Sequence, residues 1–110
     1  MTGVTDDPNH PGVKSGAPDT EPVPQNDTYL VLSAEERAKG FVRPVRRSYV
    51  HEIELGGCGV VTKMGVELAE TYARDPSFYG ATYCVGCRKH RPVGETGEFF
   101  WDGTRSKVGT

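Results

Sequence analysis

The pattern of hydrophobic and polar positions along the chain predicts a small domain built from both strands and helices. Residues 48–55 alternate with a period of two before a pair of glycines, which is typical of a strand with one buried face. Tyr49, His51 and Ile53 all fall on the apolar face of this predicted strand. Shorter segments of apolar, aromatic or β-branched residues predict further strands at residues 60–61, 81–83 and 98–101.

Two segments carry the signals of helices. Ser33 can cap a helix of about two turns, with Glu36 completing a capping box and Gly40 ending the helix. Residues 63–74 repeat apolar side chains at helical spacing, and Thr62 stands where a helix cap is expected. We therefore predict an α+β fold with two helices and a three- or four-stranded antiparallel sheet.

The beginning of the chain has almost no apolar side chains to bury. Its prolines are Pro8, Pro11, Pro18, Pro22 and Pro24, and its acids Asp6, Asp7, Asp19, Glu21 and Asp27 outnumber one base, Lys14. This composition is typical of disorder, so we predict a disordered acidic tail over residues 1–28. A chain of 110 residues has room for one compact core, which we place in residues 29–110. Residues 102–110 are polar and are expected to fray.

The composition also bears on the compartment. No apolar run approaches the roughly 18 residues that a membrane span requires, and the first residues lack the basic and apolar regions of a secretory signal. Three cysteines cannot all pair with one another. We expect a cytoplasmic protein without membrane contact, because cysteines in a reducing compartment more often bind metal than form disulfides.

The cysteines and histidines of the predicted domain suggest a zinc site. Cys84 and Cys87 have the Cys-x-x-Cys spacing that places two thiolates at two corners of a tetrahedron, and Cys58 supplies a third in a glycine-rich loop. His51 is our first choice for the fourth ligand, because one hairpin would then supply His51 and Cys58 and another the remaining pair. His90 is the alternative, since it follows Cys87 closely enough to share its loop. A metal would help a domain whose core alone gives only about 3–5 kcal/mol.

Three other interpretations of the cysteines are open. They could be ordinary reduced thiols that are buried as small hydrophobic groups. A thioredoxin-like redox motif needs a helix that begins at the motif, which Pro92 disfavours here. A zinc deaminase needs a glutamate where Ile53 stands and a proline where Tyr83 stands. Four protein ligands close a zinc site, so we expect a structural metal and no enzyme, with a zinc-dependent enzyme as the distant alternative.

Two clusters of basic residues suggest a partner. The first is Arg37, Lys39, Arg43, Arg46 and Arg47, with no acid between them, and the second is Arg88, Lys89, His90 and Arg91. If the zinc brings both to one face, that face would suit the phosphates of DNA or RNA, bound by Arg43, Arg46, Arg47, Arg88, Lys89 and Arg91. A solvated face without a ligand is the plain alternative. A module that binds a protein is a second functional candidate, and no small-molecule substrate is expected.

Several stretches resemble a known group of proteins. They are His51, Cys58-Gly-Val-Val-Thr-Lys-Met64, Ala69-Glu-Thr-Tyr-Ala-Arg-Asp-Pro76, Cys84-x-x-Cys87, His90 and Phe100-Trp101. Together with residues 35–44 they resemble small zinc-ribbon-like proteins encoded by actinobacterial phages, and the likeness covers about residues 29–109. The resemblance implies a phage origin and a metal-bound fold. A phage-encoded protein would lie in the host cytoplasm, where the protein-binding candidate would engage a host or phage protein. The resemblance implies no activity.

Overall fold

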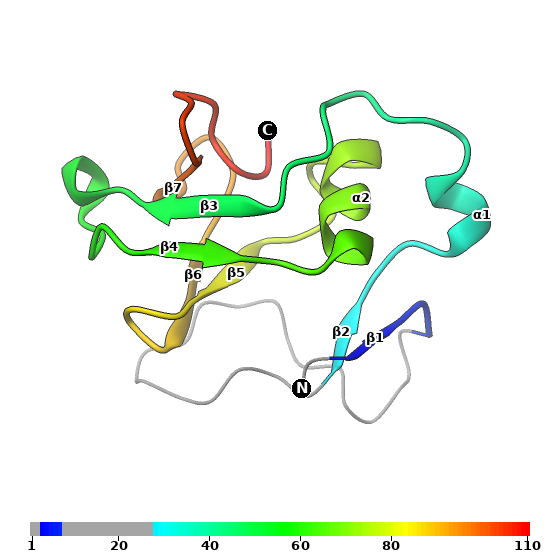
Figure 1. Ribbon diagram of the computed structural model, residues 1–110, viewed down its shortest axis with the longest axis horizontal. Coiled ribbons are helices and arrows are strands. Elements are labelled where there is room, and N and C mark those ends of the chain that lie inside the picture. Colours follow the sequence, from blue (N-terminus) through cyan, green and yellow to red (C-terminus); the bar gives the residue numbers. More distant parts are fainter. Residues whose placement is uncertain (1–2, 8–27) are drawn as a thin grey trace.

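Short strands and two α-helices surround one apolar core (Figure 1). The computed structural model describes residues 3–7 and 28–110. The strands are β1 (Gly3–Thr5), β2 (Thr28–Leu30), β3 (Ser48–His51), β4 (Val61–Lys63), β5 (Ala81–Cys84), β6 (Lys89–Pro92) and β7 (Phe99–Trp101). The helices are α1 (Ala34–Arg37), the short 3-10 helix η1 (Ile53–Leu55) and α2 (Val66–Arg74). Within the two described ranges, no helix has the length and apolar character that crossing a membrane requires.

Three strands form the antiparallel sheet that the alternating pattern predicts. Strand β3 lies in the middle, with β4 and β7 on its two sides. Tyr49 lies opposite Thr62 on β4 and opposite Trp101 on β7. Tyr49 and His51 are buried on one face of β3, whereas Val50 between them is half-buried. The predicted α+β class and three-stranded sheet are confirmed, and two further pairs of strands add to them, β1–β2 in parallel and β5–β6 antiparallel.

Strand β3 ends at His51, earlier than the alternating pattern predicts. The side chain of Glu52 caps η1 by accepting a backbone hydrogen bond, and Gly56 ends η1 in the left-handed conformation with φ of 89°. Ile53 therefore points outward and exposes 69% of its surface. The prediction that Ile53 faces the core is wrong, because the chain leaves the sheet two residues before it.

Helix α1 begins where its capping signals predict, but it spans only Ala34–Arg37, about one turn instead of the predicted two. The hydroxyl of Ser33 accepts a hydrogen bond of 3.2 Å from the N–H of Glu36, and Gly40 follows the helix with φ of 113°. The helix is held against α2 by an ion pair of 2.7 Å between Arg37 and Glu70.

Helix α2 begins at Val66, whereas the sequence predicts that it begins directly after Thr62. Thr62 belongs to β4, where it is buried and accepts a hydrogen bond of 3.2 Å from the N–H of Val85. Met64 is also buried, but from the connection that precedes the helix. Gly65 then occupies the cap position without a side-chain hydrogen bond. The pairing of β4 with β3 thus overrides the helical periodicity of this segment.

The C-terminal residues 102–110 contribute to the core, so the prediction that they fray is wrong. Val108 is completely buried, and its N–H donates a hydrogen bond of 3.1 Å to the carbonyl of Phe99. An isolated bridge joins Lys107 to Phe100. All three aromatic side chains of β7 are buried as a result.

Strand β1 lies in the stretch that the sequence predicts to be disordered. It pairs with β2, and Val4 lies opposite Tyr29. Residues 8–27, which make up most of that predicted tail, lie outside the described residues.

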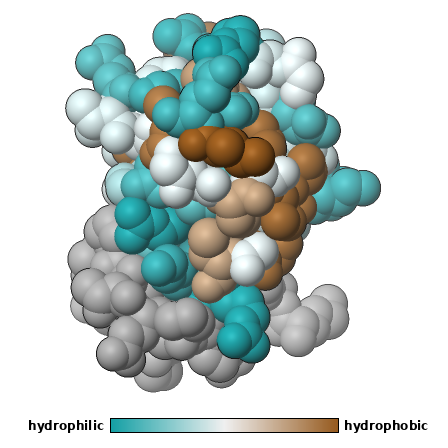
Figure 2. Space-filling view, turned by 90° about the vertical axis from the view of Figure 1, so that its left-hand side faces the viewer, coloured by the Kyte–Doolittle hydropathy of each residue, from teal (hydrophilic) through white to brown (hydrophobic). Residues whose placement is uncertain are grey.

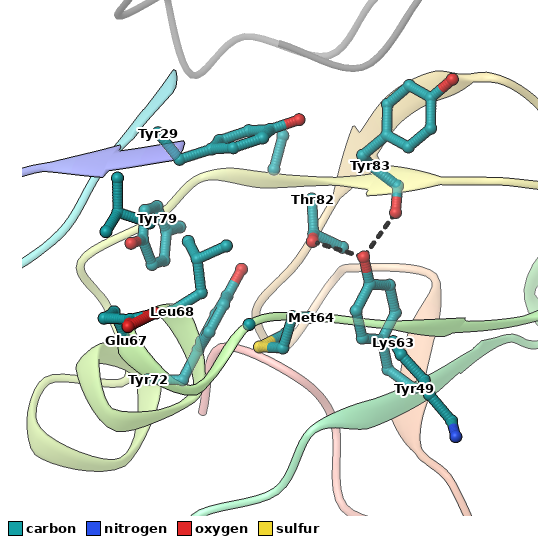
Figure 3. A pocket seen from close by; sticks show the side chains of 13 residues that line it. Tyr29, Tyr49, Lys63, Met64, Glu67, Leu68, Tyr72, Tyr79, Thr82 and Tyr83 are labelled. Carbon is teal, nitrogen blue, oxygen red and sulfur yellow. Dashed lines mark hydrogen bonds between the residues drawn. The ribbon is translucent and has the colours of Figure 1, made fainter. Parts of the chain in front are cut away.

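A cavity of about 220 Å³ lies beside α2 and β5 (Figure 3). All five tyrosines of the chain line it, namely Tyr29, Tyr49, Tyr72, Tyr79 and Tyr83, together with Met64 and Leu68. The hydroxyl of Tyr49 accepts from Thr82 and donates to the carbonyl of Tyr83, while that of Tyr79 donates to the carbonyl of Leu30. Ligand sites usually enclose about 300–1,000 Å³. We assign this smaller cavity to the packing of the core, because these hydroxyls already have partners in the protein.

Candidate metal centre

Four side chains from two hairpins converge at the end of strand β3. The imidazole of His51 and the thiols of Cys58, Cys84 and Cys87 each offer one ligand atom, and these atoms all lie within 4.8 Å of one another. The sulfurs of Cys58 and Cys84 are 3.4 Å apart, and the sulfur of Cys87 is 3.4 Å from Nδ1 of His51. A tetrahedral zinc with Zn–S bonds of about 2.3 Å has edges of roughly 3.8 Å between sulfurs. The cluster could therefore hold a metal ion such as zinc.

The two hairpins supply the ligands in the pairs that the sequence predicts. The connection from β3 to β4 carries His51 and Cys58, and the turn from β5 to β6 carries Cys84 and Cys87. Cys84 is fully buried, and its sulfur accepts a hydrogen bond of 3.4 Å from the N–H of Cys87. Its carbonyl accepts one of 2.7 Å from the N–H of Arg88, which closes the turn. The backbone of this turn therefore fixes two sulfurs before any metal binds.

Glu98 orients the imidazole of His51. Its Oε1 lies 2.7 Å from Nε2 of His51, and a carboxylate can only accept, so Nε2 carries the proton. Nδ1 consequently carries the lone pair; it lies 3.4 Å from the sulfur of Cys87 and accepts a hydrogen bond of 3.3 Å from the N–H of Cys58, which a bond to a metal ion would replace. The ring also stacks on Phe99 at 4.6 Å. A carboxylate behind a ligating histidine is a common partner in zinc sites, where it fixes the tautomer and strengthens the ligand.

Sequence reasoning did not identify Glu98 as part of the site. Arg91 holds its carboxylate through two hydrogen bonds of 3.1 and 2.8 Å and, with His51, keeps the pKa of Glu98 below its usual value. Glu98 directly precedes the aromatic residues of β7, but that position alone predicts no contact with a histidine 47 residues away. Arg91, predicted to contact nucleic acid, is instead engaged in positioning this carboxylate.

Two glycines allow the backbone to approach the ligands. A methyl group on Gly57 would lie 2.6 Å from Cδ2 of His51, and one on Gly86 would lie 2.7 Å from the sulfur of Cys58. Real side chains do not reach such distances, so a larger residue would displace His51 at the first position and either Cys58 or Val60 at the second. These close approaches indicate a cluster that is built into the packing of both hairpins.

The three thiols differ in their pKa. Burial opposes ionisation of Cys58, but hydrogen bonds, first from the backbone of Val60 and then from Cys84, outweigh it and lower its pKa to about 7. Burial raises the pKa of Cys84 to about 12 and also raises that of Cys87, and in both cases the neighbouring Cys58 adds to the effect. One thiolate is thus favoured in the cluster alone. A divalent cation would stabilise all three.

His90, the alternative ligand, lies outside the cluster. It sits on β6 opposite Tyr83, against whose ring it packs edge-on at 5.2 Å. Its Nε2 is 2.9 Å from the hydroxyl of Tyr29. The structure therefore brings His51, and not His90, to the three thiols.

The basic residues predicted to bind nucleic acid fall into two groups at opposite ends of β3 (Figure 1). Arg43, Arg46 and Arg47 precede the strand, whereas the hairpin that carries residues 88–91 meets its far end beside His51. The two clusters do not combine into one patch. Arg47 also donates a hydrogen bond of 3.1 Å to the carbonyl of Met64, so part of its hydrogen-bonding capacity serves the fold.

Apolar side chains are exposed beside the candidate metal centre, on the side of the molecule that Figure 2 shows. They are Ile53, Val60 and Val85, with exposed fractions of 69%, 39% and 47%. All three belong to the hairpins that carry the ligands, whereas Val61 lies opposite Val50 on the other face of the sheet from His51. Patterns of strands and helices did not predict this surface, because two of its residues lie in connections.

Comparisons with known proteins do not extend this description. The chain matches no protein-family model, no curated protein and no solved structure. The resemblance to zinc-ribbon-like phage proteins stays a prediction, and the functional argument depends on the geometry of the site.

Proposed function

We propose that this protein is a small non-enzymatic binding module whose fold is held together by one structural zinc ion. The observation that carries the proposal is the convergence of His51, Cys58, Cys84 and Cys87 within 4.8 Å from two hairpins. Thiolate and imidazole ligands favour zinc over magnesium or calcium, which prefer oxygen. Four protein ligands leave no open position for a substrate, which supports a structural role over a catalytic one.

The size of the domain explains why a metal would matter. A core of this size contributes only about 3–5 kcal/mol, whereas structural zinc contributes about 10–16 kcal/mol in zinc-finger peptides at neutral pH. The ion would join the β3–β4 connection to the β5–β6 turn, which are otherwise linked by a few contacts such as that between Thr62 and Val85. Removal of zinc is expected to loosen the β5–β6 hairpin from the sheet.

Metal analysis of matched histidine variants tests this proposal. The native protein is expected to contain one zinc per chain and to melt at a lower temperature after treatment with a strong chelator. His51→Ala should lose zinc, while His90→Ala should retain it because that ring lies outside the cluster. Metal-free native protein that melts cooperatively and is indifferent to chelator would refute the structural zinc.

For the partner we propose nucleic acid, bound through Arg43, Arg46 and Arg47 at one end of β3, with Arg88 and Lys89 at the other end as a separate contact. In the described ranges no acidic side chain forms an ion pair with any of these five, whereas Arg91 is paired with Glu98. Such unpaired charge suits phosphate groups. Binding to unrelated DNA or RNA should weaken steeply with salt and with Arg46→Ala combined with Arg47→Ala, whereas Lys39→Ala, which removes a base paired with Glu36, serves as the control. Salt-independent binding, or none, would contradict this partner.

The apolar surface around the metal centre favours a second candidate, a module that binds a protein. Exposed apolar side chains that cluster on a small domain often mark a protein interface. Ile53→Ser and Val85→Ser should then abolish capture of one defined protein without changing the zinc content. Capture that persists in both variants would exclude this surface.

A further inference from the structure

A second site lies away from the metal centre, in a hollow of about 460 Å³ between the segment before β3 and the C-terminal turn. Figure 1 shows these two parts of the chain side by side near the C-terminus. The hollow is lined by four bases, Arg43, Arg46, Arg105 and Lys107, and by a single acid, Glu95. Two of the bases come from the sequence cluster described above, and two come from the C-terminal residues.

Backbone oxygens hold two of these bases in place. The Nζ of Lys107 donates a hydrogen bond of 2.6 Å to the backbone carbonyl of Glu95, and Nε of Arg43 donates one of 3.1 Å to a backbone oxygen of Thr110. Within residues 3–7 and 28–110, no acidic side chain pairs with Arg46 or Lys107. The positive charges are therefore gathered before any ligand binds.

Two of the arginines, Arg46 and Arg105, lie over aromatic rings. The guanidinium of Arg46 lies 4.9 Å from the ring centre of Trp101, and that of Arg105 lies 4.5 Å from that of Phe100. Such stacking fixes the plane of a guanidinium and leaves its N–H edge available. Arg105 has one further partner, an exposed ion pair of 3.4 Å with Glu54, which a stronger anion would displace.

The burial of Arg46 leaves one polar atom without a hydrogen bond, which costs free energy that no contact of this atom offsets. Its Nε is buried without a hydrogen-bond partner. Burial lowers the pKa of its guanidinium, and the charge of Arg43 lowers it further. A buried polar atom without a partner calls for a functional explanation, and an anion in the hollow would relieve the repulsion between the two arginines.

We propose that this hollow binds a phosphate group through Arg43, Arg46, Arg105 and Lys107. Guanidinium forks match the paired oxygens of a phosphate, and a lysine adds a point charge. The phosphate belongs either to a nucleic-acid backbone, in which case the proposal rests on the proposed partner, or to a small phosphorylated molecule. Arg105 and Lys107 thus join the predicted basic residues, whereas those at the metal turn lie outside this site.

Trp101 makes the test direct, because it is the chain's single tryptophan and lies under Arg46. Inorganic phosphate is titrated into the zinc-loaded protein at constant ionic strength, with chloride as the reference anion, while tryptophan fluorescence is followed. A saturable change is expected with phosphate alone. Arg105→Gln with Lys107→Gln should weaken it at least tenfold, and Lys39→Gln, which removes a base that is paired with Glu36 and lies outside the hollow, should leave it unchanged.

A short single-stranded oligonucleotide then separates the two sources. If phosphate and the oligonucleotide compete, and the double variant weakens both, the nucleic-acid source is supported. If phosphate binds but the oligonucleotide does not, the phosphate site in the hollow is supported and nucleic acid is excluded as the partner.

Two results would refute the proposal that the hollow binds phosphate. One is a fluorescence response to phosphate no larger than that to chloride. The other is oligonucleotide binding that is weakened by Arg88→Gln but not by the double variant, which would leave the nucleic-acid partner intact. Zinc content and circular dichroism confirm that each variant is folded, and Arg105→Gln alone, at a side chain 73% exposed, provides a variant with little effect on folding.

Discussion

Gly86→Ala should weaken zinc binding although it removes no ligand. Gly86 lies in the turn between Cys84 and Cys87, and its φ is not in the left-handed region, so its backbone can accept alanine. The new methyl group would lie 2.7 Å from the sulfur of Cys58 and 2.7 Å from Cγ2 of Val60. One of these neighbours must move, and both belong to the same hairpin.

The magnitude follows from the overlap. Forcing a methyl group into a well-packed site costs about 1–3 kcal/mol. The metal-bound state bears most of this strain, because there the sulfur of Cys58 is fixed by its bond, whereas the metal-free loop can shift. The dissociation constant for zinc should therefore rise roughly 5- to 150-fold.

Competition with a chromophoric chelator at neutral pH measures this change. Gly65→Ala is the matched control, since its methyl group would meet only Oε1 of Glu67 at an ordinary 3.6 Å, far from the thiols. Its zinc affinity should equal that of the native protein. If Gly86→Ala binds zinc as tightly as the native protein does, Cys58 is not a metal ligand in the geometry described.

Three further predictions follow from the structure. Zinc binding should release at least two protons at pH 7, because the raised pKa values of Cys84 and Cys87 keep both thiols protonated. Affinity, measured by competition titration, should therefore rise roughly a hundredfold per pH unit above pH 7 and more steeply below it, where Cys58 also carries a proton, and a flat profile would exclude these ligands. Glu98→Gln should weaken zinc binding about 10- to 100-fold through His51, as judged in the same assay against Glu95→Gln. Val108→Ala should cost about 2 kcal/mol in denaturant unfolding of the zinc-loaded protein, whereas a frayed terminus would give almost no change.

The sequence predicts those features that depend on short spacings. Cys84 and Cys87 lie three residues apart, and His51 and Cys58 lie on one hairpin, so local geometry was sufficient to pair them. The capping signals of Ser33 likewise act within one turn of helix.

Features that depend on distant contacts could not be predicted in this way. The partner of Glu98 is 47 residues away, and nothing local marks it. Ile53 continues an alternating pattern beyond the point where the chain leaves the sheet. Val108 is a single apolar residue in a polar stretch, yet its burial decides where the C-terminus lies and creates the basic hollow. One buried side chain can determine a segment's position without altering its average composition.

The uneven exposure of the three cysteines has a consequence for how metal would be exchanged. Cys84 is completely enclosed, whereas Cys58 is open to solvent in a loop with glycines on either side. An incoming competitor would meet Cys58 first, and could take its place on the ion while the other ligands still held it. Transfer would then proceed through a shared intermediate, at a rate that rises with the competitor's concentration, and a bulky acceptor would be slowed by the surrounding valines.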